Sequence, residues 1–429
     1  MKPAPGRIIS VGGGKGGVGK SLVACNLAVA CAQHGRSVVL VDADLGAPNL
    51  HTLLGVERMP RTLDSLFDHQ IESLAEARLP TLIPGLELIA GSPAHPGAAN
   101  IPHAQKLKLL RHIASLEADV VMVDVGAGTS FNALDVFNVA DLRLVVTTPQ
   151  LTAIQNAYAF LKGAVHRLVR QLSPGPEQLE WLSDGQVADT ARMKGLLARV
   201  HAQSPAFAEA IELLLGSMGV FLVGNQAADA TEANVTLSVS RMIADFLSVD
   251  ARVLGTLRTS RRAHESVNLR RPWLLDPMRE PSMLTCHSIA EQLLQVNVAQ
   301  LRKARGEAEV LAGRASDDVR AEETGAQGRK HPRLPIELPV TLASGTVSIE
   351  GQTLDLSHGG ALISTPDPLP PATRWRLCFT SLRGAPSVDV LVRRVRAGKA
   401  LAGVEFATTS PLPPSLLEVL SNARVARAA

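Results

Sequence analysis

The sequence predicts an α/β fold, in which a doubly wound, mostly parallel sheet is followed by a small antiparallel β-barrel. Six short apolar runs alternate with helical segments, and a glycine-rich loop follows the first run. Each run is apolar at nearly every position, as expected for strands buried on both faces. The runs are 8–11, 37–41, 86–89, 119–123, 142–147 and 220–223. We therefore expect a sheet with helices on both sides.

The composition is that of a globular protein. Of 429 residues, 46% are hydrophobic and 19% are charged, and this length suggests two or three domains of about 150 residues. The net charge of +3 is too small to indicate nucleic-acid binding by itself. The cysteines, which are Cys25, Cys31, Cys286 and Cys378, have no CxxC spacing, so neither a zinc site nor a disulfide framework is expected. Without a signal peptide or an apolar run of roughly 18 residues, the expected location is cytoplasmic.

Composition also marks the expected domain boundaries. Residues 1–303 form the expected α/β domain, with a helical insertion at about 170–216 where Pro174 and Pro176 interrupt the pattern. Residues 304–328 are charged and rich in Ala and Gly, which predicts a flexible linker. Alternating stretches at 337–342, 351–356, 374–379, 388–395 and 402–406 predict the barrel. A final helix at 414–425 is expected to plug it.

The glycine-rich loop fits the phosphate-binding pattern GxxxxGK[ST]. It follows an expected strand and opens an expected helix, which is the context this motif requires. Backbone N–H groups would surround phosphate oxygens, Lys20 would reach the β and γ phosphates, and Ser21 would bind Mg²⁺. The residues expected to bind ATP are Gly14, Gly16, Gly17, Val18, Gly19, Lys20 and Ser21.

A second lysine, Lys15, lies inside this loop, and the segment KGGVGKS resembles the deviant Walker A signature of the MinD/ParA family of ATPases. In that family the signature lysine reaches the phosphates of the partner in a nucleotide-sandwich dimer. The resemblance therefore implies an ATP-dependent homodimer, with Lys15 and Lys20 as catalytic residues.

Two acidic segments extend the resemblance. Asp42 and Asp44 end the second strand, as in the first switch of the family, and Asp44 is expected to position the attacking water and to contribute to the Mg²⁺ site. Asp124 ends the fourth run in Walker B form and is expected to hold Mg²⁺ through water. The sequence DxGAG at 124–128 resembles the FlhG/FleN branch of flagellar regulators. Asn225 matches the asparagine of the family that reads adenine.

The chain begins a few residues before its first strand, so we expect no N-terminal activator helix like that of some flagellar members. A flagellar GTPase is therefore a disfavoured partner. The resemblance spans about residues 7–300 without the insertion.

The C-terminal part resembles PilZ domains. Arg329 and Arg333 form RxxxR, Asp355, Ser357 and Gly360 form DxSxxG, and Gly403 begins a segment like the closing strand of that family. The resemblance implies cyclic di-GMP as a ligand, with guanidinium groups on phosphate and guanine. Position 328 is Gly where many binders carry another basic residue, which leaves the ligand stoichiometry open.

The function expected is therefore an ATP-hydrolysing dimerisation switch, coupled to cyclic di-GMP, that places or numbers flagella, pili or another motility apparatus. It would act with an unidentified partner in the cytoplasm, with the inner membrane or the cell pole kept open. One alternative is a DNA-binding carrier that uses the arginines at 258, 261, 262, 270 and 271. Another is a weakly active scaffold. The helix expected at 288–301 is assigned to packing on the sheet over membrane contact.

Overall fold

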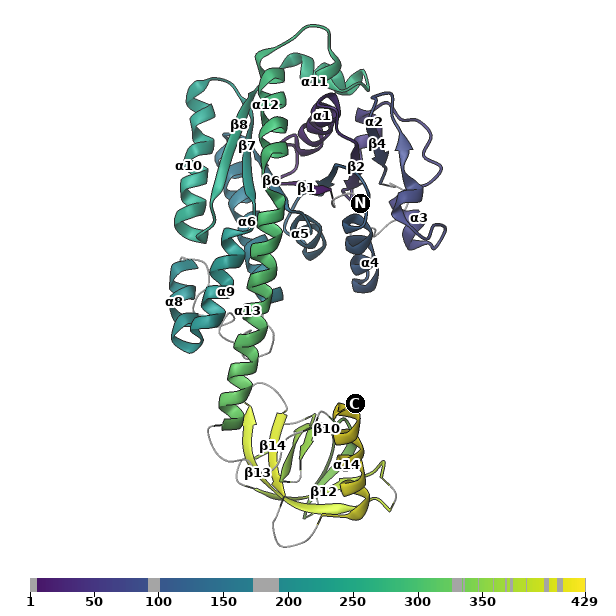
Figure 1. Ribbon diagram of the computed structural model, residues 1–429, viewed down its shortest axis with the longest axis vertical. Coiled ribbons are helices and arrows are strands. Elements are labelled where there is room, and N and C mark those ends of the chain that lie inside the picture. Colours follow the sequence, from purple (N-terminus) through teal and green to yellow (C-terminus); the bar gives the residue numbers. More distant parts are fainter. Residues whose placement is uncertain are drawn as a thin grey trace. The chain divides into compact units, whose positions relative to one another are not determined.

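The computed structural model describes residues 6–91, 101–172, 193–325, 334, 336–345, 347–357, 359–366, 369–370, 373–382, 384–396, 401–406 and 412–428. Only the backbone is described at 314, 316–325, 394–396 and 422–428. The chain divides into two compact units, Met1–Asp318 and Val319–Ala429, and each is described by itself (Figure 1).

The first unit contains an eight-stranded sheet in the order β3-β4-β2-β5-β1-β6-β7-β8. Its strands are β1 (Arg7–Gly12), β2 (Val38–Ala43), β3 (Leu79–Pro80), β4 (Leu86–Ile89), β5 (Val120–Val125), β6 (Leu142–Thr147), β7 (Val220–Ala227) and β8 (Ala251–Arg258). All neighbours are parallel except β3 and β4. The predicted parallel sheet is confirmed, and β3 and β8 were not predicted.

Helices cover both faces of this sheet and enclose two apolar cores. One face carries α1 (Lys20–Gln33), α2 (Leu50–Leu53), α11 (Arg261–Asn268), η4 (Trp273–Leu275) and α12 (Pro281–Gln295). The other carries α3 (Leu63–Phe67), η1 (Leu74–Ala77), α4 (His103–Ala114), α5 (Phe131–Asn138), α6 (Leu151–Leu172), α8 (Met193–Gln203), α9 (Pro205–Gly216) and α10 (Ala230–Leu247). The doubly wound arrangement is visible in Figure 1. The described part of the expected insertion is helical.

The segment expected as a flexible linker is instead helical as far as Gly325. Helix α13 (Val298–Gly325) covers 304–325 of the expected 304–328. Its Ala308, Ala312 and Ala315 are buried and join the core of the first unit. Ala has the highest helix propensity, and small side chains allow close packing without a large apolar pattern. The expectation of flexibility therefore does not hold for the described residues.

The single helix expected at 288–301 is divided into two helices in the structure. α12 ends at Gln295, Val296 is extended, and α13 begins at Val298. The side-chain oxygen of Asn297 accepts a hydrogen bond from the backbone N–H of Gln300 and so caps the new helix. Ile289 and Leu293 are fully buried, as packing on the sheet requires.

The second unit contains a closed barrel in the order β10-β11-β14-β13-β12-β9. Its strands are β9 (Pro339–Ser344), β10 (Val347–Ser357), β11 (Gly360–Ser364), β12 (Arg374–Phe379), β13 (Ser387–Arg396) and β14 (Leu401–Phe406), and all pairs are antiparallel. Leu416 and Leu420 of α14 (Pro414–Ala428) are buried in the barrel core. The predicted barrel and its closing helix are confirmed, whereas β11 was not predicted. Among the described residues, no helix is long and apolar enough to cross a membrane.

Candidate functional site

The loop between β1 and α1 depends on glycine. A Cβ at Gly14 would lie 1.9 Å from the carbonyl oxygen of Asn156 in α6. Gly19 has φ +89°, and a Cβ there would lie 2.3 Å from Nδ2 of Asn225. The first position is closed to a side chain by space, and the second by both space and conformation. The loop is therefore wedged between α6 and β7 in a fixed shape.

The N-terminus of α1 forms an anion site. Gly19 is the N-cap and has no side chain to bond the first N–H groups, and the first turn contains no acidic residue. These N–H groups and the helix dipole favour a negatively charged ligand. The ammonium-bearing side chain of Lys20 is buried, with 7% of the residue exposed. This combination suits phosphate oxygens.

Next to this helix end lies a buried carboxylate without hydrogen-bond partners. Asp124 of β5 is in register with Asp42 of β2 and is 1% exposed. Neither of its carboxyl oxygens has a partner among the described residues. Burial and then the charge of Asp42 raise the pKa of Asp124, whereas Ser21 and Lys20 oppose this. The Ser21 hydroxyl is thus close to the carboxylate without making a well-formed hydrogen bond.

These residues fit a hydrated Mg²⁺. A buried carboxylate without partners needs an explanation, and a cation supplies one. Mg²⁺ prefers oxygen ligands, keeps several waters and usually takes one or two carboxylates together with phosphate. Within the described residues, no group of three or more His, Cys, Asp or Glu side chains could hold a metal. A divalent ion at Asp124 and Ser21 would therefore take most of its other ligands from water and phosphate.

The two acidic residues at the end of β2 differ in their contacts. Asp42 accepts hydrogen bonds from the N–H groups of Asn49 and Leu50, both at 2.9 Å, and so shapes the loop after β2. Burial raises the pKa of Asp42 to about 7, although these bonds oppose the shift. Asp44 accepts from the N–H groups of Gly46 and Ala47, both at 3.1 Å. Asp42 thus has a structural role, and Asp44 is engaged within its own loop.

Asp44 also lies against the loop after β5. A Cβ on Gly126 would be 3.0 Å from Oδ1 of Asp44, so the close approach depends on glycine. The two loops that follow β2 and β5 therefore touch beside Asp124.

Lys15 lies on the surface of the loop. Its ammonium donates to Oε1 of Gln150 at 3.3 Å and to Oγ1 of Thr152 at 3.0 Å. Both acceptors are neutral and lie at the start of α6, so Lys15 has no ion pair among the described residues. Its charge remains available to a further anion.

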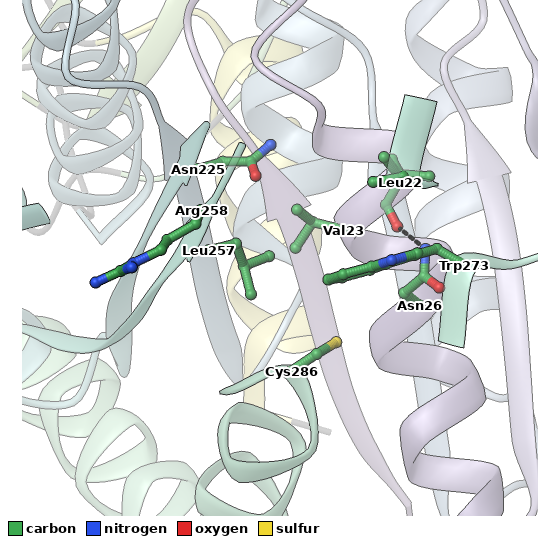
Figure 2. A pocket seen from close by; sticks show the side chains of 9 residues that line it. Leu22, Val23, Asn26, Asn225, Leu257, Arg258, Trp273 and Cys286 are labelled. Atoms are coloured by element: carbon green, nitrogen blue, oxygen red, sulfur yellow. Dashed lines mark hydrogen bonds between the residues drawn. The ribbon is translucent and has the colours of Figure 1, made fainter. Parts of the chain in front are cut away.

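Asn225 lines a small pocket together with residues of α1, β8 and η4 (Figure 2). Asn225 donates from Nδ2 to the carbonyl oxygen of Val18 at 2.8 Å, and this bond fixes the orientation of its amide. The side chains of Val23, Leu257 and Trp273 form apolar walls. The pocket has a volume of about 30 Å³, far below the roughly 300–1,000 Å³ of small-molecule sites. A base would fit there only if the walls moved apart.

Glu280 organises one wall of this pocket. It accepts hydrogen bonds from the hydroxyl of Ser260 at 2.6 Å and from the indole N–H of Trp273 at 3.2 Å. Arg262 lies 3.9 Å from Glu280 and bonds Asp276 at 3.2 Å. The segment after β8 is thus held by the carboxylates of Glu280 and Asp276.

In the barrel, DxSxxG forms the turn between β10 and β11. Asp355 accepts from the N–H of Leu362 at 3.0 Å, and Ser357 donates to the carbonyl oxygen of Gly360 at 3.2 Å. A Cβ at Gly360 would lie 2.2 Å from the carbonyl oxygen of Val404, so β14 requires glycine there. Arg329 and Arg333 lie outside the described residues. The structure therefore places only the second half of the expected ligand site.

Comparisons with known proteins agree with this architecture. A family model for ParA, described as NUBPL iron-transfer P-loop NTPase, matches residues 5–164, and a model for the PilZ domain matches residues 327–420. The septum site-determining protein MinD of Synechocystis is 32% identical over 185 residues, which is 40% of this chain and 67% of that protein. The chain belongs to the ParA/MinD family and carries a C-terminal PilZ domain.

Other relatives are an antiactivator and a flagellum site-determining protein. The antiactivator FleN of Pseudomonas aeruginosa is 38% identical over 167 residues, or 37% of this chain and 56% of FleN. The flagellum site-determining protein YlxH of Helicobacter pylori is 32% identical over 170 residues, or 36% of this chain and 53% of YlxH. The chain thus spans about half the length of these two relatives.

A solved MinD structure from Pyrococcus horikoshii, complexed with Mg-ADP, has 18% identity and a TM-score of 0.47. The match covers 67% of this chain and 95% of that one.

The structure brings most of the expected ParA/MinD residues together. Lys20, Ser21 and Asp44 lie close enough to Asp124 to influence its pKa, and Asn225 bonds the loop at Val18. Sequence reasoning missed the contacts of Gln150 and Thr152 with Lys15, and it missed Trp273 and Glu280. Gln150 and Thr152 could have been noticed because they follow a strand of the parallel sheet, where sites gather. Trp273 and Glu280 carry no comparable signal.

The expected cluster of arginines is partly neutralised. Arg261 pairs with Glu265, Arg262 with Asp276 and Arg270 with Glu57. Arg271 donates to the carbonyl oxygen of Leu275. This pairing reduces the positive charge that the surface presents.

Proposed function

We propose that the chain binds ATP with Mg²⁺, hydrolyses it and dimerises in response, as a switch of the MinD/FlhG type. The observation that carries this proposal is the unpartnered carboxylate of Asp124 beside Ser21 and Lys20. A buried carboxylate in this state is destabilising unless a ligand completes it. Family membership supports the same reading. Hydrolysis is expected to be slow and to be stimulated by a partner.

Different residues of the chain bind the phosphates, hold Mg²⁺ and orient the attacking water. The loop N–H groups and Lys20 bind the β and γ phosphates. Ser21, Asp44 and, through water, Asp124 would hold Mg²⁺, which neutralises phosphate charge when bound. Asp44 orients the attacking water after it leaves the N–H groups of Gly46 and Ala47. The expected change at Asp44 is therefore a local rearrangement of the loop after β2.

Lys15 supplies the dimer contact in this proposal. Its neutral acceptors, Gln150 and Thr152, hold it near the site without neutralising it. A cation placed on the partner's phosphates stabilises transition-state charge as an arginine finger does. Dimerisation and hydrolysis are therefore linked through one side chain.

Asn225 favours adenine over guanine. Because its Nδ2 faces the carbonyl oxygen of Val18, Oδ1 is left to accept a hydrogen bond. The exocyclic amine of adenine is a donor, whereas O6 of guanine is an acceptor. This supports ATP as the nucleotide.

The PilZ domain is the proposed receptor for cyclic di-GMP, through Arg329, Arg333, Asp355, Ser357 and Gly360. We place the output in a motility apparatus, since relatives include FleN and the flagellum site-determining protein YlxH. The proposed location is the cytoplasm, with the inner membrane surface or cell pole as sites of action.

Two assays test the proposal. The first is Mg²⁺-dependent ATP turnover of the full chain. The second is calorimetric titration with cyclic di-GMP, with Arg329→Ala/Arg333→Ala as the control. If wild type does not bind cyclic di-GMP, the proposal that this nucleotide is a ligand is wrong, and the ATPase proposal is unaffected.

The DNA-carrier alternative is weakened by the paired arginines. Retention on nonspecific duplex that needs ATP, falls steeply with salt and is lost in Arg261→Ala/Arg262→Ala would restore it. The scaffold alternative predicts that Asp44→Ala leaves turnover unchanged.

A further inference from the structure

The first turns of α13 are bonded to the N-terminal ends of the central strands β1 and β6, whereas the glycine-rich loop follows the C-terminal end of β1. Arg302 donates from Nε and Nη2 to the two carboxyl oxygens of Asp141, both at 2.7 Å, and to the carbonyl oxygen of Gly6 at 2.8 Å. Asp141 also accepts from the N–H of Ile8 at 2.9 Å. Such bidentate pairs constrain both position and orientation. Arg302 thus joins α13 to the turn before β6 and to the start of β1.

A second arginine ties the same helix to α5. Arg305 donates to the carbonyl oxygen of Asn138, the last residue of α5, at 3.4 Å. The same oxygen accepts a 2.7 Å bond from the buried Arg143. Burial lowers the pKa of Arg305. Ala308, Ala312 and Ala315 continue the buried face of α13.

Helix α5 connects this point to the nucleotide site. It begins directly after the loop that follows Asp124, and Ser130 caps it. Its eight residues span about 12 Å. At its far end, the carbonyl oxygen of Phe137 accepts from Ser10 at 2.8 Å, and Asn138 donates to the carbonyl oxygen of Ala164 at 3.0 Å. Helix α5 therefore joins the loop that follows Asp124 to groups that α13 contacts.

We infer that Arg302 and Arg305 are positioning residues that link the nucleotide site to α13, through α5 and the turn that follows it. The same helix continues across Asp318, where the first unit ends, toward the PilZ domain in sequence. The inference rests on the proposed function and names the route by which the two ligands could affect each other. Coupling of this kind is reciprocal.

A cavity beside α13 leaves room for the side chain of Arg305 to move. Arg305 and Gln171 line a cavity of about 280 Å³ between α6, α9 and α13. Gln171 also donates to Asp135 of α5 at 3.1 Å. Because one side of Arg305 borders a cavity, its side chain can be displaced without steric conflict.

Hydrogen exchange of the full chain tests the inference. The proteins are wild type, Arg305→Gln, Arg302→Gln/Arg305→Gln and the control Lys303→Gln. Lys303 is 78% exposed on the same helix and pairs only with Glu307, at 3.7 Å, among the described residues. Exchange is measured at 126–138 and 298–315, with Mg²⁺ and with or without a non-hydrolysable ATP analogue.

In wild type and Lys303→Gln, the analogue should slow exchange in both segments by about tenfold. In the arginine variants, the analogue should still slow exchange at 126–138 but should leave exchange at 298–315 unchanged. Their affinity for the analogue should stay within about twofold of that of wild type. If the analogue slows exchange at 126–138 but not at 298–315 in wild type, the inference is wrong and the proposed function is unaffected. The same holds if the arginine variants show the wild-type pattern of exchange. If the analogue does not bind, the proposed function fails and the inference fails with it. Arg305→Gln alone breaks a single long contact, so it provides the test if the double variant does not fold.

Discussion

Asp42 and Asp124 lie in register on adjacent strands, and their buried carboxyl groups have opposite hydrogen-bonding states. Asp42 accepts three backbone N–H groups, from Asp44, Asn49 and Leu50. Neither carboxyl oxygen of Asp124 has a hydrogen-bond partner among the described residues. The first carboxylate is therefore used to shape a loop, and the second is left for a ligand.

Asp124→Asn should abolish Mg²⁺-dependent turnover, with a loss of at least about 100-fold, because the cation loses its protein carboxylate. The same change removes a buried carboxyl group whose oxygens have no hydrogen-bond partner among the described residues. The free energy of unfolding in metal-free buffer should therefore stay the same or rise by about 1 kcal/mol. Turnover assays and chemical denaturation measure both effects. A variant that loses stability and keeps its turnover would contradict the assignment.

Asn225→Ala should weaken ATP binding roughly tenfold and reduce the preference for ATP over GTP, because a neutral hydrogen bond contributes about 0.5–1.5 kcal/mol. Competition binding with the two nucleotides is the measurement. Gln226→Ala is the matched control, since among the described residues the side chain of Gln226 makes only a 3.4 Å hydrogen bond, with the carbonyl oxygen of Gly17. An unchanged preference in Asn225→Ala would refute base reading by this residue.

Asp135 should stabilise the fold in a pH-dependent way. Burial raises the pKa of Asp135, but hydrogen bonds from Arg167 and Lys106 more than offset this and leave it below its ordinary value. The stabilisation is therefore present above about pH 4, the pKa of an unfolded Asp, and is lost as pH falls through the lower folded pKa.

Asp135→Asn should accordingly cost about 3 kcal/mol at pH 7, since it leaves the buried Lys106 without its partner. The difference from wild type should shrink below about pH 4. Glu265→Gln, at the exposed pair with Arg261, should change stability by less than about 1 kcal/mol. Denaturation curves at several pH values give the comparison, and a difference that does not vary with pH would count against the pairing.

The sequence was informative where burial is complete. Central strands such as β5 are apolar on both faces and were readable as continuous runs, whereas β8 is partly exposed and lacks that pattern. The glycine-rich loop was readable because its function depends on local backbone shape. Helix α13 was mistaken for a linker because its buried residues are alanines, which do not stand out in a charged segment. Trp273 and Glu280 meet through tertiary contacts that no local pattern records.

The most direct test of the account is the mass of the full chain in solution with Mg²⁺ and saturating nucleotide. Asp44→Ala should block hydrolysis and hold the chain in its ATP state. We predict that this variant is a dimer with ATP and a monomer with ADP, and that Lys15→Ala in the same background stays monomeric while binding ATP. A chain that remains monomeric with bound ATP, or dimerises equally without Lys15, would contradict the account.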